Sequence, residues 1–130
     1  MEFHRIKETC LYIHDLEKAK HFYHSLLGLP VINYMPGKHL FLRVGESVLL
    51  LFNAEDSRLK SSPPPHFGGG KQHFAFEISG KDYANAKGEV EKKGIVIIDE
   101  ITWPGGKNSF YFNDPEGNVL EILPECGIWD

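Results

Sequence analysis

The sequence predicts an α+β fold built from two tandem βαβββ modules. Three observations support this prediction. The order strand, helix, strand, strand, strand is found twice; a segment rich in Ser, Pro and Gly separates the two copies; and apolar residues recur at helical or strand spacing in the matching segments. We expect a single domain over residues 1–130, with module 1 at about 4–55, a linker at 56–71 and module 2 at about 72–125.

The first module begins with a strand-like segment, Ile6–Ile13. Asp15 is suited to cap a helix from about Leu16 to Leu27, whose apolar residues recur on one face. Gly28 is placed to end that helix. Three short apolar strands follow, separated by turn-forming pairs: Val31–Met35, His39–Val44 and Val48–Phe52.

The linker contains a run of prolines and a run of glycines, Pro63-Pro64-Pro65 and Gly68-Gly69-Gly70. This composition is typical of a solvated connection, and a lid over a site is the alternative interpretation.

The second module repeats the order of the first. A strand is expected at Gln72–Ile78 and a helix at Tyr83–Lys93, which Gly94 ends. Three further strands are expected at Ile95–Ile101, Ser109–Asn113 and Val119–Leu123. Superposition of the two halves at an offset of 65 residues pairs Glu8 with His73, Ile13 with Ile78, Ala19 with Ala84 and Val31 with Val96. The last strands are paired at an offset of 71, which places Leu50 against Glu121.

Four of these paired positions are predicted to share the face of the sheet that no helix covers, because side chains alternate along a strand: Glu8, Leu50, His73 and Glu121. Carboxylate and imidazole ligands suit Mn²⁺, Fe²⁺, Ni²⁺, Co²⁺ or Zn²⁺, and three protein ligands leave positions open for water and substrate. We therefore predict a catalytic metal site at Glu8, His73 and Glu121. Taken singly, Glu8 also fits an exposed strand end and His73 a structural histidine. Glu121 interrupts an apolar run, where an unpaired carboxylate is costly to bury.

The same alternation provides candidate substrate-binding residues: Arg43, Tyr111, His39, Cys10 and Leu50. Arg43 with Tyr111 is suited to hold an anionic group, since arginine presents forked donors. A salt bridge from Arg43 to Glu77 or Glu121 is an equally good interpretation. Cys10 fits a small buried residue better than a reactive thiol.

Composition excludes several classes of protein. The net charge of −4 argues against a nucleic-acid binder, and no apolar run approaches the ~18–20 residues of a membrane span. The N-terminus lacks the pattern of a secretion signal, and two cysteines do not make a disulfide framework. We expect a cytoplasmic protein that binds neither nucleic acid nor membrane.

Three stretches of the chain resemble the vicinal oxygen chelate superfamily, which includes glyoxalase I, extradiol dioxygenases, fosfomycin-resistance enzymes and bleomycin-resistance proteins. The segment from Glu8 to Leu29 resembles its opening, His73-Phe74-Ala75-Phe76 the start of its second module, and Phe110 to Glu121 its C-terminal signature. The resemblance implies two βαβββ modules in a curved mixed β-sheet cup around one divalent metal (Mn, Fe, Ni, Co, Zn or Mg), a small-molecule substrate chelated to that metal, and a homodimer.

The resemblance also implies roles for individual residues. Glu8, His73 and Glu121 match the metal ligands, and Glu121 and Tyr111 are implied to be catalytic; Tyr111 lies where fosfomycin-resistance enzymes place a phosphonate-binding tyrosine. The chain departs from the pattern at Glu8, where a histidine is usual, and at Leu50, where glyoxalase I has a fourth ligand. The leading hypothesis is a metal-dependent lyase, transferase or oxygenase acting on an oxygen-rich molecule. The alternatives are a metal-free protein that sequesters a ligand, as bleomycin-resistance proteins do, and a fosfomycin-resistance-like thiol transferase.

Overall fold

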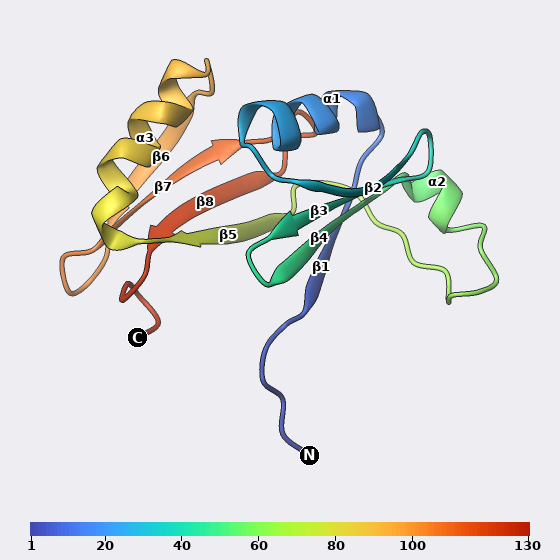
Figure 1. Cartoon of the computed structure of the whole chain (residues 1–130), viewed down its shortest axis with the longest axis horizontal. Coiled ribbons are helices and arrows are strands. Elements are labelled where there is room, and N and C mark those ends of the chain that lie inside the picture. Colours follow the sequence, from blue (N-terminus) through green and yellow to red (C-terminus); the bar gives the residue numbers. More distant parts are fainter. The chain divides into compact units, whose positions relative to one another are not determined.

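Each half of the chain folds around its own four-stranded mixed sheet (Figure 1). The computed structural model describes all of residues 1–130, which divide into a first unit, residues 1–70, and a second unit, residues 71–130. The repeated βαβββ order predicted from the sequence is confirmed. No helix has both the length and the apolar character needed to cross a membrane.

The first unit has the strand order β1-β4-β3-β2, with β1 parallel to β4 and the other pairs antiparallel. Its elements are β1 (Glu8–Tyr12), α1 (Leu16–Lys20), a π-helix (His21–Leu26), β2 (Val31–Met35), β3 (His39–Val44), β4 (Ser47–Phe52) and α2 (Ala54–Ser57).

Helix α1 covers one face of the first sheet. Its N-cap is Asp15, whose side chain accepts a hydrogen bond from the Lys18 backbone at 3.0 Å. The hydroxyl of Tyr34, on β2, donates to Glu17 of the helix. Leu40 and Leu51 lie on this same face of the sheet and are fully buried. The opposite face of the first sheet is therefore the one that α1 leaves open.

The single helix expected at 16–27 is instead a short α-helix followed by a π-helix. The π-helical turns bury two consecutive aromatic rings, Phe22 and Tyr23, whose centroids are 5.1 Å apart. As expected, Gly28 ends the helix: its φ is +79° and its N–H donates to the His24 carbonyl.

The second unit repeats this architecture with the order β5-β8-β7-β6, in which β5 is parallel to β8. Its elements are β5 (His73–Ile78), a 3-10 helix (Gly80–Asp82), α3 (Tyr83–Lys92), β6 (Ile97–Thr102), β7 (Asn108–Asn113) and β8 (Val119–Pro124). Tyr83 of α3 contacts Phe110 edge-to-face at 5.4 Å. Phe110, Phe112 and Leu120 are fully buried on that face.

The parallel strand pairs of the two sheets have equivalent registers. Glu8 is opposite Val48 and Cys10 opposite Leu50 in the first, as His73 is opposite Val119 and Ala75 opposite Glu121 in the second. This confirms the repeat and makes Leu50 the counterpart of Glu121. Strands β2 and β6, which lie at equivalent edges of the two sheets, also carry a register irregularity near their first residues.

Two of the proposed pairings are wrong. Val31 corresponds to Ile97, not to Val96, because each of Val31 and Ile97 opens the irregular stretch of its strand. Val96 lies outside β6 and is exposed. Ala19 is buried whereas Ala84 is exposed, so the two helices present different positions to their sheets.

The linker is more structured than its composition suggests. It begins with part of α2, whose N-cap Asn53 accepts backbone hydrogen bonds from Glu55 and Asp56. Further along, the main chain of His66 accepts a hydrogen bond from the Ser57 hydroxyl.

Candidate metal centre

The second unit brings three of the predicted site residues together. Glu121 lies on β8, the strand between β5, which carries His73, and β7, which carries Tyr111. Nε2 of His73 is 3.4 Å from Oε2 of Glu121, and the hydroxyl of Tyr111 is 2.9 Å from Oε1. The rings of His73 and Tyr111 stack at 6.2 Å. Because side chains alternate along a strand, Tyr111 and Glu121 lie on the face opposite Phe110.

The hydrogen bonds of His73 fix its tautomer. Nδ1 is 2.9 Å from the carbonyl oxygen of Val119. A carbonyl oxygen only accepts, so Nδ1 carries a proton, and Nε2 of the neutral ring has a free lone pair. That lone pair is directed at the carboxylate of Glu121. Histidines that bind metals are commonly held in this way, with the other ring N–H donated to a backbone carbonyl.

Glu121 is a carboxylate in an apolar environment. It is 5 % exposed, between buried Leu120 and Ile122. Tyr111 donates to Oε1 and so leaves Oε2 for another partner. Burial and the neighbouring carboxylate raise the pKa of Tyr111 above its ordinary 10.0, although a hydrogen bond from Ser109 lowers it. The phenol is therefore neutral at physiological pH and acts as a donor.

The pair His73 and Glu121 fits a divalent cation. An imidazole lone pair and a carboxylate oxygen repel at 3.4 Å unless a proton or a cation lies between them. Two atoms bound to one cation at about 2.0–2.2 Å lie roughly 3–3.6 Å apart, which matches this spacing. No group of three His, Cys, Asp or Glu side chains suited to a metal is formed, so the pair by itself supplies two ligands.

The first unit places the other predicted residues on its open face. Glu8 begins β1 and is exposed; Cys10 follows on the same face, opposite Leu50 of β4. Leu50 is buried. Burial, and then the charge of Glu8, raises the pKa of the Cys10 thiol above 9.0, which keeps it neutral. Arg43 is exposed on β3 and lies opposite Val48, the same residue that pairs with Glu8.

An aromatic cluster lies further along this open face. The ring of His39 stacks on Phe41 at 4.1 Å, and Phe52 contacts both edge-on. His66 packs against Phe52 at 4.6 Å and hydrogen-bonds to the hydroxyl of Tyr12 at 2.9 Å. The cluster gives this part of the open face an apolar surface edged by the polar atoms of His39, His66 and Tyr12.

His39 is part of this aromatic cluster, and its ring is neutral. Nε2 contacts the side-chain oxygen of Asn33 at 2.6 Å, and Nδ1 is buried without a hydrogen-bond partner. Burial, reinforced by Lys60, lowers the pKa of His39.

Sequence reasoning missed two groups of residues. His66 lies in the proline-rich linker, whose composition predicts solvent rather than a contact with the sheet. Trp103 and Ser109 extend the hydrogen bonds of Tyr111: the indole Nε1 is 2.9 Å from the Ser109 hydroxyl, which is 3.5 Å from that of Tyr111. Alternation along the strand places Ser109 on the same face as Tyr111, but nothing in the sequence connects Trp103 with either residue.

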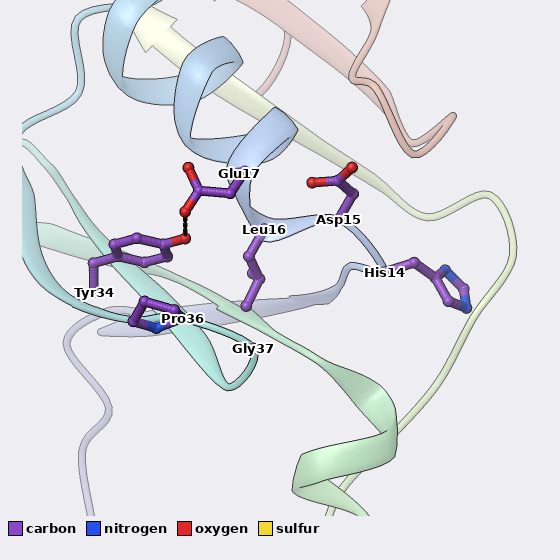
Figure 2. Close-up of a pocket in the computed structure, with 7 residues that line it drawn as sticks. All are labelled: His14, Asp15, Leu16, Glu17, Tyr34, Pro36 and Gly37. Carbon is purple, nitrogen blue, oxygen red and sulfur yellow. Dashed lines mark hydrogen bonds between the residues drawn. The ribbon is translucent and has the colours of Figure 1, made fainter.

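A cavity of about 330 Å³ lies on the other side of the first sheet, beside α1 (Figure 2). It is lined by His14, Asp15, Leu16, Glu17, Tyr34, Pro36 and Gly37. None of the residues predicted from the sequence to bind a metal or a substrate lines this cavity.

Fold and residue pattern together define a protein with two βαβββ modules and a His–Glu pair suited to a cation. The family model of the Glyoxalase/Bleomycin resistance protein/Dioxygenase superfamily matches residues 5–122. The chain belongs to this superfamily, as the resemblance implied.

Individual relatives carry different activities. The chain is 30 % identical over 117 residues to a glutathione transferase FosA of Serratia marcescens, covering 90 % of this chain and 78 % of the relative. It is 32 % identical to a lactoylglutathione lyase of Agrobacterium tumefaciens, with a TM-score of 0.88 and 93 % of both chains covered. A fosfomycin resistance protein FosX of Listeria monocytogenes, solved with Mn(II), shares the fold with a TM-score of 0.71 at 17 % identity. The match covers 98 % of this chain and 94 % of that protein.

Proposed function

We propose that this protein is a divalent-metal-dependent enzyme of the superfamily, acting as a lyase, transferase or oxygenase on a small oxygen-rich substrate. The two units are modules of one domain, and the metal ligands are Glu8, His73 and Glu121. By resemblance to the family, we also expect a homodimer and a cytoplasmic location.

One observation carries this proposal: Nε2 of His73 and Oε2 of buried Glu121 are 3.4 Å apart, and the other polar atom of each side chain is held by a hydrogen bond. The hydrogen bonds direct both groups toward the same point, and with a neutral His73 ring this is an arrangement that a cation would stabilise.

Each residue has a distinct role in this proposal. His73 and Glu121 hold the ion, and Glu8 is the third ligand, which leaves positions for substrate oxygens. When bound, the ion acts as a Lewis acid that polarises a substrate oxygen. Tyr111 is neutral and its proton is donated to Glu121, so its role is to fix that carboxylate. The aromatic cluster and Arg43 bind the substrate and its anionic groups.

Two substrate classes have support from relatives at 30 % identity or above. The first is a glutathione hemithioacetal, after the lactoylglutathione lyase, and the second is fosfomycin with a thiol, after the glutathione transferase FosA. Leu50, a buried aliphatic residue at the register position equivalent to Glu121, provides no carboxylate there. This weighs against the four-ligand arrangement of glyoxalase I and favours a three-ligand site.

The test is an activity screen with a metal control. Protein freed of metal with a chelator is assayed with and without Mn²⁺ on methylglyoxal–glutathione hemithioacetal, on catechols and on fosfomycin with glutathione or cysteine. We expect turnover of one class that requires the metal and disappears in Glu121→Gln. Tight binding of a small molecule by the metal-free protein, without turnover in any assay, would instead support the metal-free sequestering alternative.

A further inference from the structure

An unbroken series of hydrogen bonds leads to Glu121 through the second unit. The indole Nε1 of Trp103 lies 2.9 Å from Oγ of Ser109, and Oγ lies 3.5 Å from the hydroxyl of Tyr111. That hydroxyl lies 2.9 Å from Oε1 of Glu121. We call these four residues the Trp103–Glu121 hydrogen-bond series.

The chemistry of the two ends gives the series one direction. An indole N–H only donates and a carboxylate only accepts. Ser109 accepts from Trp103, so its single proton points to Tyr111, and the proton of Tyr111 points to Glu121. Hydrogen bonds aligned in this way polarise and strengthen one another in a low-dielectric interior.

Backbone hydrogen bonds position Trp103, the first residue of the series. Trp103 directly follows β6, and its backbone N–H donates to the Lys107 carbonyl at 2.8 Å, while its own carbonyl accepts from Gly106 at 2.9 Å. This turn holds the indole against Ser109, which is fully buried on β7. The side chains of Ser109 and Tyr111, two residues apart on one strand, lie on the same face.

We propose that Trp103 and Ser109 are positioning residues for the metal centre, acting through Tyr111 to hold Oε1 of Glu121 and keep Oε2 directed at the cation. This inference rests on the proposed metal site and adds two residues that contact neither the metal nor the substrate. If they served only to pack the interior, their removal would lower stability without changing the protein's affinity for a metal.

The test measures Mn²⁺ affinity by titration of the chelator-treated full-length protein. The variants are Trp103→Phe, which removes the indole N–H but keeps a ring, Ser109→Ala and Tyr111→Phe, with Trp129→Phe as a matched control because Trp129 is 85 % exposed. We expect Tyr111→Phe to lower the affinity by roughly 10-fold or more, as is typical when the direct partner of a metal ligand is lost. Ser109→Ala and Trp103→Phe, which act through Tyr111, should lower it by a smaller factor. The control binds as the wild type does.

A double-mutant cycle tests the route. If Trp103 and Ser109 act through Tyr111, then Trp103→Phe or Ser109→Ala adds no further loss of affinity in the Tyr111→Phe background. Independent losses that multiply in the double variants would overturn the proposed route. Because each of the two residues has its own cycle, one variant that fails to fold leaves the other to decide.

A measurement on the metal-free protein tests the Trp103–Glu121 hydrogen-bond series itself. In the nuclear magnetic resonance spectrum of the metal-free protein, Ser109→Ala is expected to shift the indole N–H signal of Trp103 and leave that of Trp129 unchanged. Unchanged Mn²⁺ affinity in Trp103→Phe and Ser109→Ala, with wild-type protein binding Mn²⁺, would overturn this inference alone. Absence of Mn²⁺ binding by the wild type would overturn the proposed function as well.

Discussion

Glu121 is the residue whose environment most constrains function. A carboxylate at 5 % exposure needs compensation, because burying an unpaired charge costs several kcal/mol. Tyr111 satisfies one of its oxygens, and the nearest partner of the other is Nε2 of His73, at 3.4 Å. When the His73 ring is neutral, Nε2 and the carboxylate are both acceptors, and a cation between them would stabilise the protein.

Replacing Glu121 by glutamine separates the metal from the fold. The new amide would keep an oxygen for Tyr111 and could donate its N–H to Nε2 of His73, so we expect the metal-free variant Glu121→Gln to be at least as stable as the wild type. Mn²⁺ at 100 times its Kd should stabilise the wild type by about 2.7 kcal/mol and leave Glu121→Gln unchanged. Thermal unfolding with and without Mn²⁺ measures both effects.

The control for that experiment is Glu91→Gln, at an exposed position on α3, which should retain the full response to Mn²⁺. A variant at Glu121 that keeps the response, or a metal-free variant that is strongly destabilised, would argue that the carboxylate is structural.

At the scale of the residue, sequence reasoning identified His73 and Glu121 as candidates but did not identify Trp103. Glu121 stood out because it interrupts an apolar strand, and His73 because it occupies the position equivalent to Glu8. Trp103 could not be predicted, since its contact with Ser109 depends on the turn that follows β6.

At the element scale, helix α1 and strand β2 are joined by the hydrogen bond from Tyr34 to Glu17. The hydrogen bond to Glu17, with burial and the charges of Glu17 and Asp15, raises the pKa of Tyr34 from 10.0 to about 12. A tyrosine whose pKa is raised by folding contributes stability that is complete below pH 10 and is lost as the pH rises through about 12.

We therefore expect the wild type to lose more unfolding free energy between pH 10 and pH 12 than Tyr34→Phe does. Denaturant unfolding at several pH values in this range measures the difference. Glu17→Gln, which keeps an acceptor but removes the charge, should give an intermediate slope. Equal slopes for all three proteins would show that folding does not raise the pKa of Tyr34.

The N-caps of helices α1 and α3 offer a second test at this scale. The side chain of Asp15 accepts the Lys18 N–H at 3.0 Å, whereas Asp82, the N-cap of α3, makes no such hydrogen bond. Asp15→Ala should lower the unfolding free energy by about 1 kcal/mol and Asp82→Ala by much less. Chemical denaturation of both variants checks the ranking, and equal losses would contradict it.

The elements were predictable where local chemistry determines them. The repeated order of strands and helix, the cap Asp15 and the stop Gly28 all follow from residues that act on their neighbours. The π-helix and the contact of His66 with Phe52 do not, because both depend on packing against residues distant in the sequence.

At the scale of the whole molecule, the proposed ligands come from two units whose sheets have equivalent strand pairing. Glu8 comes from the first unit and His73 and Glu121 from the second, while Leu50 takes the fourth equivalent position without a ligand atom. Membership of the superfamily establishes the fold, and the choice among its activities depends on whether the chain binds a metal at all.

The most direct test of this account is the metal content of the full-length protein, purified without chelators and measured by elemental analysis per chain. The wild type is expected to hold one divalent ion per chain. Glu8→Gln in the first unit, and His73→Ala or Glu121→Gln in the second, should each lower that content, and Glu91→Gln should not. No bound metal in the wild type, together with no stabilisation on addition of Mn²⁺, would contradict the account.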